Sequence, residues 1–249
     1  MKQLGQSPDA PYLSVVIPAY NETGRLGVTL ERVVVYLAEQ DYASEIIVVD
    51  DGSDDDTARL AEEALEGRIS HRVLINDGNR GKGYSVRRGM LEAAGERALF
   101  SDADLSTPIE HTADLLAAIE GGADIAIGSR AVHGSDIELR QPLLRQTAGK
   151  MFSLVQRMLL GTHIADTQCG FKMFTREAAQ AVFSHQTLER WAFDAEVLVI
   201  AQRLGFTVAE VPVRWVNSPD TRVRMIPDGL KMVRDLAVIR SRHRSLRAE

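Results

Sequence analysis

The sequence lacks the features that define several classes of protein. Its 249 residues include one cysteine, Cys169, so an internal disulfide is impossible and a reducing compartment is expected. Apolar runs all fall short of the ~18 residues that a membrane-spanning helix needs. The first eleven residues also lack the apolar core of a secretory signal. We therefore expect a cytoplasmic protein, and a disulfide-rich secreted domain is excluded.

Several catalytic motifs are missing as well. The Gly-x4-Gly-Lys-Ser/Thr pattern of a P-loop is absent, and no Gly-x-Gly-x-x-Gly follows the first apolar run, so a dinucleotide fold of the Rossmann type is not expected. A nucleophile elbow for Ser/His/Asp catalysis is absent too. Metal-ligand spacing is not found among the six histidines, which are His71, His111, His133, His163, His185 and His243.

The composition is that of an ordinary globular protein, but the charge is distributed unevenly along the chain. Hydrophobic residues make up 45% and charged residues 26% of the chain. Residues 1–138 carry 12 basic and 25 acidic side chains, whereas residues 139–249 carry 17 basic and 10 acidic ones. The net charge of −6 therefore combines −13 with +7, and the two parts are expected to meet different partners.

Short apolar β-branched runs alternate with helical patterns in the first half. We predict strands at 12–17, 45–50, 73–76, 98–100, 123–128, 171–175 and 207–215. We predict helices at about 25–40, 55–66, 82–95, 108–120, 142–160, 192–204 and 226–242. This order indicates an α/β fold, with a mostly parallel central sheet covered by helices on both faces.

Ligands of open parallel sheets bind at the carboxyl ends of the strands, and the loops predicted there are polar. Asp102 and Asp104 directly follow one strand, and residues i and i+2 of an extended segment point to the same side. Two such carboxylates can bind Mg²⁺ or Mn²⁺. Because Asp-x-Asp is also common in segments that have no function, this prediction depends on the position of the two acids at the end of a strand.

Helix starts are expected next to these acids. Thr107 and Glu110, with Pro108 between them, form one expected capping box, and Ser53 with Asp56 forms another. Residues 79–84, which include Lys82, contain two glycines and two cations, a pattern typical of phosphate binding or of glycines that simply mark a helix start.

The basic half contains two amphipathic candidates. The 142–160 segment carries Arg145, Lys150 and Arg157 without an acid, and residues 222–247 carry eight basic and two acidic side chains. Such segments can lie on an anionic membrane surface, and a core helix with a solvated basic face is the plainer alternative. Nucleic acid is not expected, because aromatic residues are not interleaved with the cations and the pI is about 5.6.

Several blocks together resemble glycosyltransferase family 2, which has the GT-A fold. The matching segments are residues 16–22, 48–54, 102–104 and 128–130, and the resemblance spans roughly residues 12–240. Within the family it is nearest to polyprenyl-phosphate sugar synthases of the dolichyl-phosphate glucosyltransferase branch, through residues 79–84, 102–108, 166–172 and 190–196.

The resemblance implies a role for each matched residue. The donor nucleotide is expected at Pro18, Ala19, Tyr20, Glu22, Asp50, Asp51, Gly52, Lys82, Asp102 and Ala103. Asp102 and Asp104 are expected to hold Mg²⁺ or Mn²⁺, although Ser106 stands where the mannosyl branch has a further ligand, a Gln. The acceptor phosphate is expected at Arg130, Arg145, Lys172, Arg222 and Arg224. Asp104, Asp194, Arg130 and Arg145 are the expected catalytic residues.

The resemblance also implies a domain plan and a reaction. We expect a flexible stretch at 1–10, one catalytic domain at 11–240 and a basic tail at 241–249. Within the domain, 11–130 would bind the nucleotide, 131–225 the acceptor, and 226–240 would be the C-terminal helix. The implied reaction is inverting transfer of a hexose, in first place glucose from UDP-glucose, to a polyprenyl phosphate at the cytoplasmic membrane face.

Three other functions stay open. The enzyme can instead be a GDP-mannose-dependent polyprenyl-phosphate mannosyltransferase, or a family 2 transferase with a soluble saccharide acceptor, for which Asp194 would be the base. A sugar-nucleotide-binding protein without turnover is the alternative outside enzymes. The sequence contains no indication of an oligomeric state.

Overall fold

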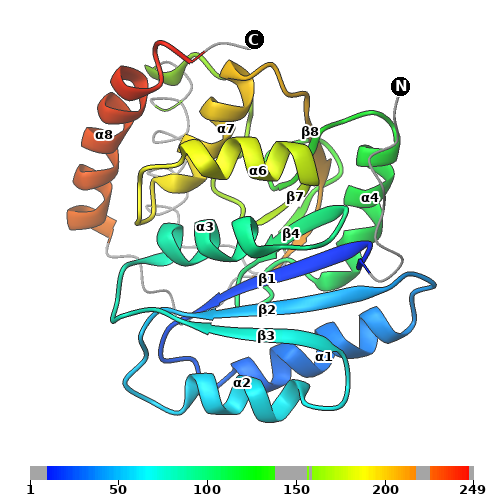
Figure 1. Cartoon of the computed structure of the whole chain (residues 1–249). Helices are drawn as coiled ribbons and strands as arrows, with labels where there is room; N and C mark the ends of the chain where they lie inside the picture. Colours follow the sequence, from blue (N-terminus) through cyan, green and yellow to red (C-terminus); the bar gives the residue numbers. More distant parts are fainter. Residues whose placement is uncertain (1–9, 138–155, 157–158, 217–224, 247–249) are drawn as a thin grey trace.

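The computed structural model describes residues 10–137, 156, 159–216 and 225–246. The predicted α/β architecture is confirmed: helices pack on both faces of a seven-stranded sheet (Figure 1). The strands of this sheet are β1 (Leu13–Ala19), β2 (Ser44–Asp50), β3 (Ser70–Ile75), β4 (Arg97–Ser101), β5 (Ile125–Ser129), β7 (Phe171–Thr175) and β8 (Val208–Pro212). A separate parallel pair joins β6 (Asp136–Ile137) to β9 (Arg214–Trp215).

The sheet order is β3-β2-β1-β4-β7-β5-β8. Neighbouring strands run parallel except at β7, which pairs antiparallel with both β4 and β5. Because β7 runs backwards, residues just before its start lie beside the carboxyl ends of β4 and β5. The segment that leads into Phe171 therefore reaches the edge of the sheet where the acidic loops end.

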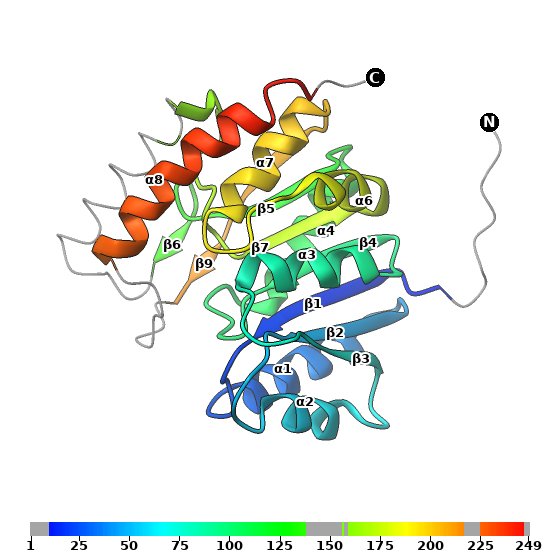
Figure 2. The same ribbon diagram turned by 60° about the vertical axis from the view of Figure 1, so that its left-hand side comes forward.

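Helices cover the two faces in separate groups. One face carries α1 (Leu26–Ala38), α2 (Thr57–Leu65) and α4 (Thr112–Glu120), and the other carries α3 (Lys82–Glu92), α6 (Arg176–His185) and α7 (Phe193–Arg203). Successive residues of β1 alternate between the two cores, with Val15 and Ile17 on one side and Val16 on the other. The last helix, α8 (Met225–Arg242), packs on α7 (Figure 2).

Several predicted boundaries are wrong. The 73–76 strand begins earlier, at Ser70, and the 207–215 strand divides into β8 and β9 around Val213. The 108–120 helix consists of a 3-10 turn, η1 (Ile109–His111), followed by α4. Helix α6 was not predicted, although Thr175 caps it by accepting a hydrogen bond from the Ala178 N–H at 3.2 Å. The predicted helix at 142–160 lies almost entirely outside the described residues.

Both predicted capping boxes are also wrong. The Ser53 hydroxyl donates to Asp50 instead, and Asp55 accepts the Thr57 N–H at 3.0 Å where α2 begins. Thr107 lies against the sulfur of Cys169 at 3.6 Å, and η1 has no side-chain cap. In both places the side chain that the local pattern assigned to the helix start has another partner, which is a nearby carboxylate for Ser53 and a distant sulfur for Thr107. Among the described helices, none is both long and apolar enough to cross a bilayer.

Candidate active site

The two acids of the Asp-x-Asp motif follow β4 and lie on the same side of the chain. Asp102 and Asp104 are partly exposed, whereas Ala103 and Leu105 are buried, which agrees with the predicted alternation. Leu105 has a φ of +45°, so the chain turns sharply just after the motif. The Ser106 N–H donates to Asp104 Oδ1 at 3.0 Å and holds that carboxylate in the turn.

Asp102 is supported from behind by the segment that leads into β7. Its N–H donates to the carbonyl of Gly170 at 3.1 Å. A Cβ atom at Gly170 would lie 2.2 Å from Asp102 Oδ2, so only glycine leaves room for this carboxylate. The Asp102 side chain is 34% exposed, so it can contact a ligand while it also contacts other residues of the protein.

Lys82 brings a cation to the same acid from the first turn of α3. Its ammonium lies 2.5 Å from Asp102 Oδ1 and 4.0 Å from Asp194 Oδ2. Burial alone would lower the pKa of Lys82, but Asp102 and Asp194 outweigh it and hold that pKa above its usual range. Lys82 therefore stays protonated between the two carboxylates.

Asp194 is paired with Lys172 inside the protein. The Lys172 ammonium contacts Asp194 Oδ1 and donates to the Cys169 carbonyl at 2.6 Å, and neither side chain is more than 4% exposed. Lys172 was predicted to contact an acceptor phosphate, and this role stays a prediction. In this structure the ammonium compensates the buried charge of Asp194 instead.

Arg130 forms a bidentate ion pair with Asp166. Its Nε and Nη2 atoms lie 2.7 and 2.9 Å from the Asp166 oxygens, and its guanidinium carbon lies 5.2 Å from the centre of the Trp215 ring. Burial raises the pKa of Asp166, but Arg130 outweighs it and the net pKa is lowered. Asp166 was not among the predicted site residues, because its partner is 36 residues away and no local spacing marks the pair.

The predicted nucleotide loops also lie at this edge, after β1 and β2. Asp50 is buried and accepts the Ser53 hydroxyl and N–H. Asp51 accepts hydrogen bonds from Asn76 Nδ2, the Ser85 hydroxyl and two backbone N–H groups at 2.7–3.1 Å. Asp51 therefore fixes the turn before Lys82, and a direct nucleotide contact of this residue stays a prediction.

The other predicted nucleotide residues lie in the same region. Pro18 and Ala19 end β1, Tyr20 follows it, and Glu22 pairs with Arg25. A Cβ atom at Gly52 would lie 2.3 Å from the Cα atom of Gly78, so this glycine lets the two loops touch. The fold thus gathers Pro18 to Glu22, Asp50 to Gly52, Lys82 and Asp102 to Asp104 at one edge of the sheet. Arg145, Arg222 and Arg224 lie outside the described residues.

The Asp-x-Asp pair fits a divalent cation in part. Its carboxylates are hard oxygen ligands, and Asp102 already forms an ion pair with the ammonium of Lys82. Within the described part of the chain, no three His, Cys, Asp or Glu side chains group closely enough to hold a metal ion. Two carboxylates would supply only part of a coordination shell, and the remainder would have to come from a substrate and water.

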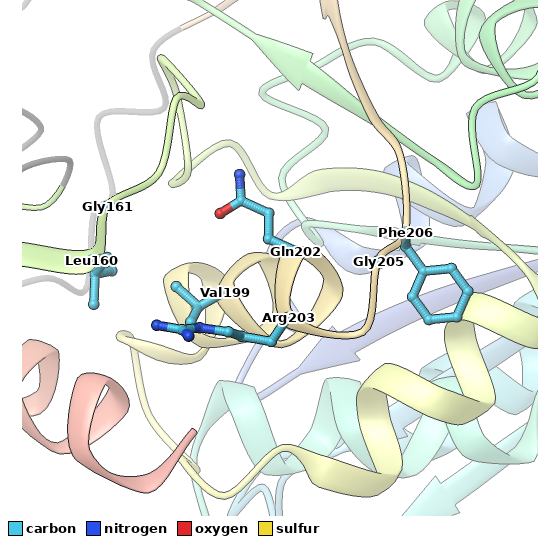
Figure 3. Close-up of a pocket in the computed structure, with 7 residues that line it drawn as sticks. All are labelled: Leu160, Gly161, Val199, Gln202, Arg203, Gly205 and Phe206. Atoms are coloured by element: carbon cyan, nitrogen blue, oxygen red, sulfur yellow. The ribbon is translucent and has the colours of Figure 1, made fainter. Parts of the chain in front are cut away.

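A separate pocket of about 400 Å³ lies at the C-terminal end of α7 (Figure 3). It is lined by Leu160, Gly161, Val199, Gln202, Arg203, Gly205 and Phe206. These residues surround the end of α7 and the turn before β8, whereas Asp194 is in the first turn of α7. The pocket is therefore at the opposite edge of the sheet from the Asp-x-Asp motif.

Comparisons with known proteins identify the family of this chain. The family model described as glycosyl transferase family 2 matches residues 14–183. A dolichyl-phosphate beta-glucosyltransferase of Dictyostelium discoideum is 38% identical over 94% of this chain and 76% of its own length. Proteins of the same name from Saccharomyces cerevisiae and Homo sapiens are 34% and 36% identical, over 94% and 93% of this chain and 76% and 75% of their own lengths.

A solved structure shares the fold at lower identity. Glucosyl-3-phosphoglycerate synthase from Mycobacterium tuberculosis, in complex with Mn²⁺, UDP-glucose and phosphoglyceric acid, superposes with a TM-score of 0.68. It is 20% identical, and the match covers 93% of this chain and 79% of that one. Together with the family match, the sheet order and the acids after β4, these findings show that the chain is a GT-A-fold enzyme that belongs to glycosyl transferase family 2.

Proposed function

We propose that this chain transfers glucose from UDP-glucose to a polyprenyl phosphate of the dolichyl type, with inversion at the sugar carbon. The observation that carries the proposal is the row of charges Asp104, Asp102, Lys82, Asp194 and Lys172 beside the β1 and β2 loops. Relatives that carry the name dolichyl-phosphate beta-glucosyltransferase, 34–38% identical over most of the chain, support this donor and acceptor.

The donor would bind across the carboxyl ends of β1, β2 and β4. Tyr20 and Asp50 would contact the nucleoside, and the diphosphate would lie between Lys82 and the Asp102–Asp104 pair. Mg²⁺ or Mn²⁺ bound by that pair would neutralise charge on the leaving diphosphate. The complexes of the M. tuberculosis enzyme with UDP and Mn²⁺ or Mg²⁺ support a divalent ion here.

The acceptor requires cations more than it requires a base. A phosphate monoester is already anionic at neutral pH, so it can attack the sugar once it is held in line with the leaving group. Attack from the face opposite the leaving diphosphate inverts the carbon and gives a β-linked product. Arg130, Arg145, Arg222 and Arg224 are proposed to hold this phosphate, and Asp194, fixed by Lys172, is proposed to orient the sugar hydroxyls.

We also propose that the enzyme works at the cytoplasmic membrane face as a peripheral protein. The support is the acceptor class and the eight basic against two acidic side chains in residues 222–247. Each cation near an anionic surface contributes ~1 kcal/mol at most. Flotation with phosphatidylserine vesicles should carry the protein upward at low salt, and failure to float with activity retained on a water-soluble acceptor would overturn this part.

A donor and acceptor matrix tests the main proposal. UDP-glucose and GDP-mannose would each be offered with a short dolichyl phosphate, phosphoglyceric acid and a soluble saccharide. We expect turnover with UDP-glucose and dolichyl phosphate, and its loss on chelation. Preference for GDP-mannose would overturn the choice of donor, and preference for another acceptor would overturn the lipid. UDP binding with no turnover on any acceptor would favour a sugar-nucleotide-binding protein.

Two substitutions separate a phosphate acceptor from an alcohol acceptor. An alcohol needs a general base, so Asp194→Asn would be the more damaging change if the acceptor were a saccharide. A phosphate needs cations, so Arg145→Ala should be damaging under our proposal. The comparison requires kcat and KM for the acceptor with both variants.

A further inference from the structure

Glu196 is a buried acid that the reaction outlined above does not use. It lies one turn into α7 and its side chain is fully buried. Burial would raise the pKa of this carboxyl, but hydrogen bonds from His243 and Thr187 outweigh it and the net pKa is lowered. A buried, ionised carboxylate has to be compensated, so its partners indicate what it holds together.

The partners of Glu196 come from two separate segments of the chain, one just before α7 and one at the end of α8. Thr187 donates to it from the backbone at 3.1 Å and from the hydroxyl at 2.6 Å, and the Leu188 N–H donates at 2.8 Å. His243 Nε2, just beyond the end of α8, lies 2.8 Å from Glu196 Oε1 and is itself buried. Arg242 of α8 also donates to the Thr187 hydroxyl, at 2.9 Å. One carboxylate thus connects the C-terminal helix to the 186–189 segment.

The 186–189 segment packs directly against the turn that carries Lys82. The Tyr84 N–H donates to the Glu189 carbonyl at 3.1 Å, and Gln186 Nε2 donates to the Gly83 carbonyl at 2.8 Å. Cβ atoms at Gly81 and Gly83 would lie 2.5 and 2.7 Å from the carbonyl oxygens of Glu189 and Leu188. Any movement of this segment therefore shifts the backbone on both sides of Lys82.

We propose that Glu196 and His243 are positioning residues of the donor site, through which the C-terminal end of α8 fixes the Lys82 turn. Within residues 241–249, which were predicted as a basic tail, His243 is buried against α7 and Leu246 packs on the core of that face. The inference rests on the proposed donor site, because it assumes that Lys82 contacts the nucleotide diphosphate.

The experiment measures the affinity for UDP with Mn²⁺ by calorimetry, on the full chain and well below the melting temperature of each variant. His243→Leu removes the donor to Glu196 and should weaken UDP binding about three- to tenfold. His243→Gln keeps a side-chain N–H and should restore the affinity to within about twofold of the wild type. Thr187→Val removes another donor to Glu196 and should weaken UDP binding in the same direction, which keeps the test open if His243→Leu fails to fold.

A double-mutant cycle separates positioning from general loss of stability. If His243 acts through Lys82, then His243→Leu should have no further effect on UDP affinity in a Lys82→Met background. The stability control is Leu65→Ala, because Leu65 is buried on α2 in the core on the other face of the sheet. We expect it to lower the melting temperature without changing UDP affinity.

The outcomes that overturn the inference are distinct. The inference is overturned if His243→Leu leaves UDP affinity unchanged, or if it weakens UDP binding as much in the Lys82→Met background as in the wild type. It is also overturned if Leu65→Ala loses as much UDP affinity as His243→Leu. Each of these results would leave the proposed function intact. Failure of the wild-type chain to bind UDP would overturn the proposed donor site and the inference with it.

Discussion

The Nζ atom of Lys82 lies 2.5 Å from Oδ1 of Asp102, so the first acid of the Asp-x-Asp motif is already paired with a cation of the protein. The same ammonium is 4.0 Å from Asp194, which has its own partner in Lys172. Negative and positive groups therefore alternate along the site. Such an arrangement can accept a diphosphate and a divalent ion together, because each brings the charge that the other compensates.

Lys82→Met should weaken donor binding. A hydrogen bond to a charged group contributes about 1.5–3 kcal/mol, so kcat/KM for UDP-glucose should fall by about tenfold to a hundredfold. Asp194 keeps Lys172, so we expect the fold to survive. Arg59→Met is the matched control, because it removes one exposed cation from α2 without touching the site. Equal UDP affinity in Lys82→Met and wild type would contradict this prediction.

Asp104→Ala should strongly reduce turnover while leaving the fold intact. The carboxylate makes one local hydrogen bond, to the Ser106 N–H, so few packing contacts are lost. If Asp104 holds the divalent ion, activity should drop by about a hundredfold or more. Mn²⁺ binding in the presence of UDP, followed by electron paramagnetic resonance, should weaken in parallel. Metal binding as tight as in the wild type would exclude Asp104 as a ligand.

Gly170→Ala should displace Asp102 without straining the backbone of residue 170. A Cβ atom would lie 2.2 Å from the carboxylate, so Asp102 has to rotate away from its present position. Changes next to a metal ligand typically cost 10–100-fold in affinity or activity, and we expect a loss of about that size. Gly24→Ala is the control, because a Cβ there meets nothing within 4 Å. A Gly170→Ala enzyme with wild-type activity would show that the exact placement of Asp102 is unimportant.

Local sequence patterns predicted the buried strands and the loops at their carboxyl ends. Continuous apolar runs indicated the buried strands, and the carboxyl-end rule placed the loops of Asp50 and Asp102 at one edge, which the structure confirms. The i, i+2 spacing put Asp102 and Asp104 on one side, and both are indeed partly exposed between buried neighbours.

Pairings between distant residues could not be predicted in this way. Arg130 meets Asp166 and Lys172 meets Asp194 only because β7 enters the sheet backwards between β4 and β5. An apolar run such as 171–175 is compatible with several sheet positions, so neither its direction nor these ion pairs follow from spacing. The capping box at Ser53 failed for a different reason, because Asp50, only three residues earlier, accepts the hydroxyl.

The lowered pKa of Glu196 predicts how its contribution to stability depends on pH. The reference pKa of 4.5 applies to the unfolded chain, and the folded chain binds the proton more weakly. Around and below pH 4.5 the unfolded chain therefore holds more protons than the folded one. The stabilisation is present in full above that value and is lost as the pH falls through the lower folded pKa.

Glu196→Gln tests this dependence. At neutral pH the variant should unfold more easily by about 2 kcal/mol, because hydrogen bonds to a charged acceptor become bonds to a neutral one. The difference in the free energy of unfolding should shrink as the pH falls from 4.5 through the lower folded pKa, because the unfolded wild-type chain then gains a proton that the folded chain binds more weakly. Urea unfolding at a series of pH values measures it. Asp166 also has a lowered pKa but is unchanged in both proteins, so its contribution cancels in the difference. A gap that stays constant down to low pH would show that Glu196 is not ionised in the folded chain.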